Sequence, residues 1–144
     1  MSQTAGGTPM LGRPDGEPHV RLLRYRAMVD QIHERVRATI PARATVLVVS
    51  KGDVELLRLE GCQGWHFPQD ATGAYAGYYP AGDAAAIAHL AELRERGAQF
   101  LLLPATAFWW LDYYAGLRAY LERETRLIVH QRHVCSMYML QRDD

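Results

Sequence analysis

Hydrophobic residues near the start of the chain recur at spacings of three and four. Between His19 and Thr39 they are Val20, Leu22, Leu23, Met28, Val29, Ile32 and Val36. This spacing gathers them on one face of an α-helix. Pro18 suits the first helical turn and Pro41 follows the last one. The pattern therefore predicts a helix over residues 19–39.

Residues 44–50 and 98–104 are short and almost continuously apolar, which is typical of strands buried inside a sheet. Residues 125–131 and 134–140 are also predicted to be strands. A fifth short strand is predicted at residues 63–67, stopped by Pro68. Only Arg132 and His133 separate the last two segments, so these are expected to form an antiparallel hairpin.

Polar residues in front of three further segments are expected to cap helices. These N-caps are Asp53, Asp83 and Thr106, and their helices extend to about Gly61, Gly97 and residue 124. Residues 69–82, between the first two of these helices, are rich in Gly and Tyr and show no period. Long loops inside a compact domain are often functional.

This order of elements predicts an α/β fold. Alternating strands and helices form a mostly parallel sheet with helices on both faces and right-handed crossovers. We expect a three-layer, doubly wound, Rossmann-like domain with an antiparallel C-terminal edge strand. A single α/β domain would span residues 18–144, after a disordered tail over residues 1–17 that is rich in Gly, Pro, Ser and Thr.

The charge balance narrows the range of partners. The chain has 144 residues, with 16 basic and 16 acidic side chains. Because a nucleic-acid binder would carry a basic face, no nucleic-acid partner is expected. A net charge near zero favours self-association, so a homodimer is one alternative. No apolar run is long enough for a membrane span and no signal peptide is recognisable, so we expect a cytoplasmic protein.

The carboxyl ends of the predicted parallel strands indicate where a ligand would bind, because the crevice of such sheets lies beyond them. Three segments follow those ends, and a loop carrying Tyr75, Tyr78 and Tyr79 would cover the same edge. The candidate ligand-binding residues are Ser50, Lys51, Gly52, Asp53, His66, Gln69, Tyr78, Thr106, Trp109 and Trp110.

Each candidate also has a purely structural interpretation. Residues 50–53 could form only a turn and a helix cap, or an anion site that uses Lys51, the chain's only lysine. His66 could be a hydrogen-bonded structural histidine, or a general base oriented by Asp70. Trp109 and Trp110 are neighbours on a helix and point about 100° apart, so one should be partly exposed. It would then cover the sheet edge, stack on a ligand or anchor an interface.

Several chemical signatures are missing from the sequence. Neither of the glycine-rich phosphate-binding motifs occurs, nor a G-x-S-x-G elbow or an H-E-x-x-H motif. His130 and His133 lie at a hairpin turn, where their spacing suits a metal poorly, so no metal site is expected. Cys62 and Cys135 show no paired spacing. Whether the chain is an enzyme, and which cofactor it would use, stay open.

Four segments together resemble a poorly characterised bacterial module found beside, or fused to, glycosyltransferases and other cell-surface polysaccharide biosynthesis proteins. They are VVSKGD (48–53), GWHFPQ (64–69), YAGYYPA (75–81) and PATAFWWLDYY (104–114). The resemblance implies a Rossmann-like fold and a link to sugar transfer, and it carries no assigned catalytic residue.

Three functional hypotheses follow. The first is a non-catalytic accessory domain in surface polysaccharide biosynthesis, which binds a glycosyltransferase, another protein partner or a nucleotide-like ligand. The alternative is a small glycosyl- or methyltransferase with a nucleotide-derived cofactor. In that case Lys51 would contact an anionic group, His66 would act as base, a tryptophan would stack on the cofactor's base, and Glu60 or Asp70 would bind the ribose. The third hypothesis is that the chain is an inert remnant of a larger enzyme.

Overall fold

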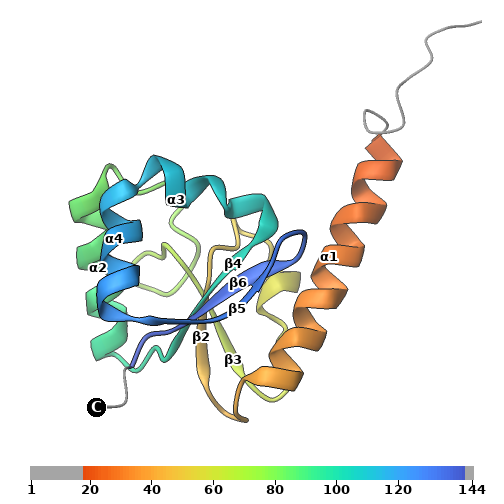
Figure 1. Ribbon diagram of the computed structural model, residues 1–144, viewed down its shortest axis with the longest axis horizontal. Coiled ribbons are helices and arrows are strands. Elements are labelled where there is room, and N and C mark those ends of the chain that lie inside the picture. Colours follow the sequence, from red (N-terminus) through yellow and green to blue (C-terminus); the bar gives the residue numbers. More distant parts are fainter. Residues whose placement is uncertain (1–17, 142–144) are drawn as a thin grey trace, which may run out of the picture.

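The computed structural model describes residues 18–141 and shows one mixed sheet with helices packed against it (Figure 1). The helical elements are α1 (Pro18–Thr39), η2 (Val54–Leu57), α2 (Asp83–Glu95), η3 (Ala105–Ala107), α3 (Trp109–Tyr113) and α4 (Ala115–Glu124). The strands are β2 (Thr45–Val48), β3 (Gln63–His66), β4 (Phe100–Pro104), β5 (Arg126–Gln131) and β6 (Cys135–Met139). The tail predicted over residues 1–17 lies outside the described residues.

The sheet is open and has the strand order β3-β2-β4-β6-β5. Strand β2 pairs in parallel with both β3 and β4, as the alternating elements predict. The C-terminal hairpin is antiparallel, but its order differs from the prediction. Strand β6 pairs with β4 as well as β5, so the last strand lies inside the sheet and β5 forms the edge. The reason is burial, since β6 is almost entirely buried whereas β5 is largely exposed.

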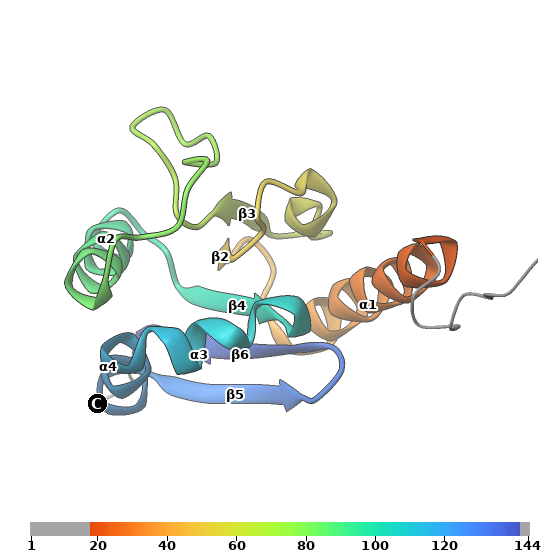
Figure 2. The ribbon, with the colours of Figure 1, turned by 90° about the horizontal axis from the view of Figure 1, so that it is seen from above.

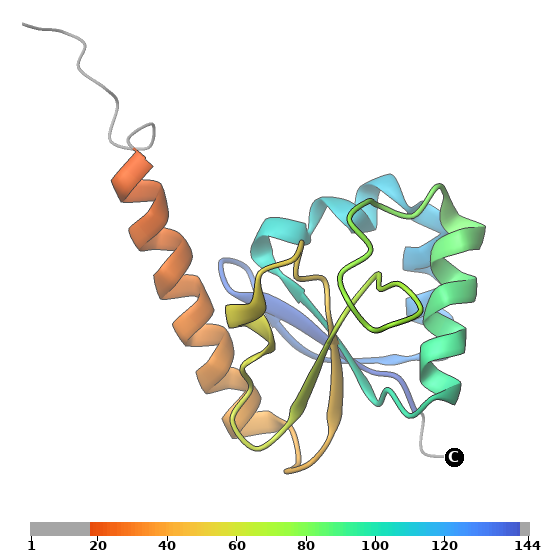
Figure 3. The same cartoon turned by 180° about the vertical axis from the view of Figure 1, so that it is seen from behind.

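Alternate residues of the strands point to two faces, which pack against different helices (Figure 2). We call the side covered by α2, α3 and α4 the aromatic face, because its core contains Phe67, Trp110, Tyr114 and Tyr138. We call the side covered by α1 and η2 the aliphatic face, whose core consists mainly of Ile, Val, Leu and Met side chains. The N-terminal half of α1 extends beyond the sheet (Figures 1 and 3).

Two of the predicted helices are shorter or broken. The segment after Asp53 forms the single 3-10 turn η2, with Asp53 as its N-cap accepting from the Glu55 amide at 2.9 Å. The segment predicted as one helix from Thr106 to residue 124 is divided into η3, α3 and α4. Thr106 lies within η3 and caps nothing, since Pro104 is the N-cap there.

Asp83 also differs from its predicted role. Gly82 is the N-cap of α2, without a side-chain hydrogen bond. The Asp83 carboxylate instead accepts from the Gly116 and Leu117 amides, at 3.0 and 3.2 Å. It therefore caps the neighbouring helix α4, whose chain re-enters helical geometry after the break at Tyr114. Gly97, with φ of 116°, ends α2 as predicted.

No helix within residues 18–141 combines the length and the apolar character needed to cross a lipid bilayer.

Candidate functional site

The turn after β2 holds the chain's only lysine in an unusual backbone conformation. Lys51 and Gly52 have φ values of 53° and 86°. The Asp53 amide donates to the Ser50 carbonyl at 3.0 Å, which closes the turn. Positive φ at both central residues is the pattern of a type I′ turn and is rare for a side chain such as lysine. A Cβ on Gly52 would lie 3.1 Å from the Tyr75 ring, so a glycine suits this position sterically as well.

A hydrogen-bonded pair joins this turn to the end of β3. The Ser50 hydroxyl lies 2.5 Å from His66 Nδ1 and also accepts from the Gly52 amide at 3.2 Å. Ser50 is buried, and burial lowers the pKa of His66 below its ordinary value. The imidazole is therefore largely neutral at neutral pH, and its Nδ1 can accept the Ser50 proton.

Asp70, proposed to orient His66, has other partners. Its carboxylate accepts from the Thr72 hydroxyl and amide and from the Ala74 amide, at 2.6 to 3.1 Å. These bonds, the Thr72 hydroxyl first, lower the pKa of Asp70. Asp70 thus closes its own turn, an arrangement that short polar side chains favour, and Ser50 is the partner of His66.

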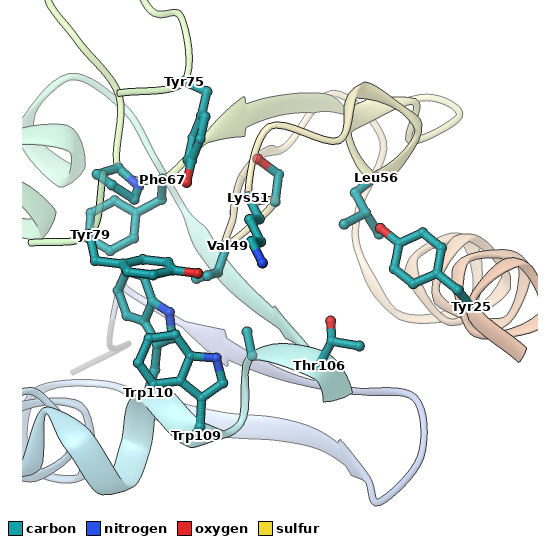
Figure 4. Close-up of a pocket in the computed structure, with 13 residues that line it drawn as sticks. Tyr25, Val49, Lys51, Leu56, Phe67, Tyr75, Tyr79, Thr106, Trp109 and Trp110 are labelled. Carbon is teal, nitrogen blue, oxygen red and sulfur yellow. The ribbon is translucent and has the colours of Figure 1, made fainter. Parts of the chain in front are cut away.

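Two long-range hydrogen bonds hold the ends of the loop over residues 69–82. At its start, the Gln69 amide donates to His89 Nε2 of α2 at 3.0 Å. At its end, the buried Tyr114 hydroxyl donates to the Pro80 carbonyl at 2.6 Å. Fixed in this way, the loop brings Tyr75 and Tyr79 above the carboxyl ends of β2 and β4 (Figure 4).

Aromatic side chains form a continuous wall from the core to the surface. Trp110 is 1% exposed and packs on Phe67 with ring centroids 5.9 Å apart, whereas Trp109 is 40% exposed. The ring centroid of Trp109 lies 5.0 Å from that of Tyr79 and 6.0 Å from that of Tyr113, and both pairs are packed edge to face. The prediction that one of the two tryptophans is partly exposed is confirmed.

These segments enclose a cavity of about 240 Å³ at the carboxyl edge of the sheet (Figure 4). Five of the residues predicted from sequence line it: Ser50, Lys51, Thr106, Trp109 and Trp110. Figure 4 shows the Lys51 ammonium pointing into the cavity, with Tyr79 and the tryptophans on one side and Thr106 on the other. Residues that follow β2 and β4 thus meet at one site, as the topology of parallel strands requires.

The other five candidates do not line this cavity. Gly52 and Asp53 build the turn behind it. His66 and Gln69 border a separate hollow of about 290 Å³ on the β3 side. Tyr78 is 69% exposed and lies outside both hollows.

Several cavity residues were not among the candidates. Tyr75 and Tyr79 belong to the loop that the sequence places over this edge, and Phe67 follows β3 directly. Tyr25, on α1, gave no sequence signal because its partner is 28 residues away: its hydroxyl donates to the Asp53 carboxylate. Burial, together with this bond and the charge of Asp53, raises the pKa of Tyr25, so the phenol stays protonated.

Within residues 18–141, no group of three or more His, Cys, Asp or Glu side chains is placed so that it could hold a metal ion. His130, one of the two histidines considered as metal ligands from the sequence, has its Nδ1 atom 2.7 Å from the Ser136 hydroxyl.

The cavity combines one cation with aromatic surfaces. Among the described residues that line it, none is Asp or Glu. Such a site suits a ligand with a negative charge and a flat ring, because the ammonium attracts the charge and the aromatic rings stack on the flat ring.

Comparisons of the chain with models of protein families, with curated proteins and with solved structures find no match.

Proposed function

We propose that this chain is an accessory domain that binds a small anionic ligand with a planar ring, such as a nucleotide. The observation that carries the proposal is the placement of Lys51. A left-handed turn holds it at the carboxyl edge of the sheet, and its ammonium enters a cavity walled by Tyr75, Tyr79 and Trp109.

The neutral polar groups of the cavity support the same ligand class. The Thr106 hydroxyl can donate to an anion or a sugar. Burial raises the pKa of Tyr75, against the opposing effect of Lys51, so this phenol also remains a donor. Apolar walls with a few convergent polar groups are the usual composition of a small-molecule site.

The proposal includes the finer architecture, a Rossmann-like arrangement of three layers. This arrangement is supported by the parallel strands β3, β2 and β4, by the helices on both faces and by the cavity at the carboxyl ends.

The proposal also includes a role beside a glycosyltransferase in surface polysaccharide synthesis, which is supported by the resemblance of the four sequence segments. Co-purification with a glycosyltransferase encoded next to this chain would test that role, and the absence of any complex would contradict it.

Calorimetry on Lys51→Met tests ligand binding. Methionine is unbranched like lysine and one heavy atom shorter, so the substitution removes the ammonium group and keeps most of the side chain. We expect wild type to bind AMP or UMP, and the variant to bind about tenfold or more weakly, since a hydrogen bond to a charged group contributes about 1.5–3 kcal/mol.

Arg123→Met is the matched control, because Arg123 is an exposed cation on α4 whose guanidinium lies 3.0 Å from Glu124. It should bind the nucleotides like wild type. The proposal is wrong if wild type binds neither nucleotide, or if Lys51→Met binds as tightly as the control.

One observation favours the alternative, a small transferase. Ser50 reaches the cavity and its hydroxyl is hydrogen-bonded to a neutral His66. Such a pair can remove a proton from an acceptor group. Incubation with nucleotide sugars and with S-adenosylmethionine, followed by mass spectrometry, would detect turnover. Product that disappears in Ser50→Ala would favour catalysis over binding alone.

A further inference from the structure

A second hollow, of about 1080 Å³, adjoins the aromatic cavity. Tyr25 and Thr106 line both hollows, so the two adjoin at these side chains. One side of this groove comes from α1, where its lining residues lie between Pro18 and Gln31 and include Met28. Its far side is the turn between β5 and β6.

Three arginines line the groove. Among the residues that the structure describes, Arg21 and Arg24 line it from α1, and Arg132 lines it from the hairpin turn, beside His133. Among the described residues that border it there is no Asp or Glu. In a chain with equal numbers of acidic and basic side chains, this is a local concentration of positive charge. Guanidinium groups bind phosphate through paired, planar hydrogen bonds, and here they approach from two separate elements.

The size of the aromatic cavity makes the groove relevant to the ligand. A volume of about 240 Å³ lies below the roughly 300–1,000 Å³ of sites that enclose a whole drug-sized molecule. The cavity therefore suits a ring and the group beside it. A longer ligand that extends past Tyr25 and Thr106 would enter the groove that Arg21 and Arg132 line.

We propose that the ligand is a nucleoside diphosphate or an ester of one, with its base in the aromatic cavity, its first phosphate near Lys51 and its second phosphate in the groove lined by Arg21 and Arg132. This inference rests on the proposed function, because it extends the ligand from the same cavity. It adds that the number of phosphates sets the affinity and that α1 and the hairpin turn are part of the site.

The test is calorimetry with AMP, ADP, UMP and UDP on three proteins: wild type, the double variant Arg21→Gln/Arg132→Gln, and the control Arg118→Gln/Arg123→Gln. Both changed residues of each variant are exposed. The control removes the same charge from α4, outside both hollows. For wild type and control, we expect the diphosphates to bind about tenfold or more tightly than the monophosphates. For Arg21→Gln/Arg132→Gln, we expect this ratio to fall to within about twofold, with monophosphate affinity unchanged.

The outcomes separate the two proposals. If wild type binds mono- and diphosphates equally well, the extension into the groove is wrong while the aromatic cavity still binds nucleotides. If the control loses the discrimination as fully as Arg21→Gln/Arg132→Gln, only net charge matters and the groove is not a site. If wild type binds none of the four nucleotides, both proposals fail. The comparison of ligands on wild type needs no variant, so a misfolded variant cannot obscure the result.

Discussion

The two faces of the sheet are packed with different kinds of side chain, and each contributes something different to the site. The aromatic face buries Phe67 and Trp110, which also line the cavity. In the aliphatic cluster, within residues 18–141, Phe100 is the one buried aromatic residue, and most of the other buried side chains end in methyl groups. A large ring can belong to the core at one end and form a broad cavity wall at the other.

The aliphatic face contributes Leu56 to the cavity lining, together with two polar pairs. Ser50 continues the alternation of Val46 and Val48, which point to this face, and its hydroxyl meets His66. Tyr25, from the helix that covers this face, holds Asp53. Both pairs fasten the turn that carries Lys51. The site thus lies where a rigid ring wall from one face meets a hydrogen-bonded turn from the other.

The largest expected effect is a difference in the free energy of unfolding between variants of the two neighbouring tryptophans. Replacing Trp110 by alanine removes a 1% exposed ring from the core, so we expect a loss of about 3–5 kcal/mol in the free energy of unfolding. Trp109→Ala, at a 40% exposed position, should cost only about 1 kcal/mol yet weaken nucleotide binding. Urea denaturation and calorimetry measure the two properties. Equal losses of stability would mean that core and cavity wall are not distinct parts of the aromatic face.

A smaller effect is expected from packing on the aliphatic side. A Cβ on Gly64 would lie 2.5 Å from the Leu57 carbonyl oxygen and 2.8 Å from its Cα, both backbone atoms of η2. Gly64→Ala should therefore push η2 away from β3 and cost about 1–3 kcal/mol in urea denaturation.

Gly82→Ala is the matched control for this substitution. Its Cβ would meet no atom within 4 Å, so its cost should stay below about 1 kcal/mol. Equal costs for the two variants would contradict a steric origin of the effect at Gly64.

The periodicity of the chain predicted the elements and the parallel part of the sheet, but not the full strand order. A two-residue connection shows that β5 and β6 pair, and not which of them lies next to β4. The composition of the two strands held that information. Residues 134–140 are nearly all apolar, which suits an interior strand, whereas Arg126, His130 and Gln131 suit an edge.

The site was predictable where it depends on strand ends and unpredictable where it depends on contacts between distant elements. Lys51, Thr106 and Trp109 meet because parallel strands end at one edge. The contribution of Tyr25 depends on how α1 crosses the aliphatic face, which no local pattern records. The prediction that Asp83 caps its own helix was wrong for a related reason. A side chain at the start of one helix can also reach a neighbouring helix, and Asp83 reaches α4.

The smallest expected effect concerns pH and the polar pair of the aliphatic face. Burial holds the pKa of His66 below its ordinary value of about 6.5, so the unfolded chain binds a proton here more readily than the folded one. By linkage, the contribution of His66 to stability is fully present above pH of about 6.5 and is lost as pH falls through the lowered pKa. Thermal unfolding across this range should show the folded protein losing stability on acidification.

His66→Asn isolates that contribution, because asparagine can still hydrogen-bond to Ser50 and does not titrate. Other histidines and the carboxylates titrate alike in both proteins, so their effects cancel in the comparison of slopes. We expect the melting temperature of wild type to fall more steeply than that of the variant between about pH 7 and pH 5. Parallel curves would show that His66 is solvated well enough to accept a proton freely.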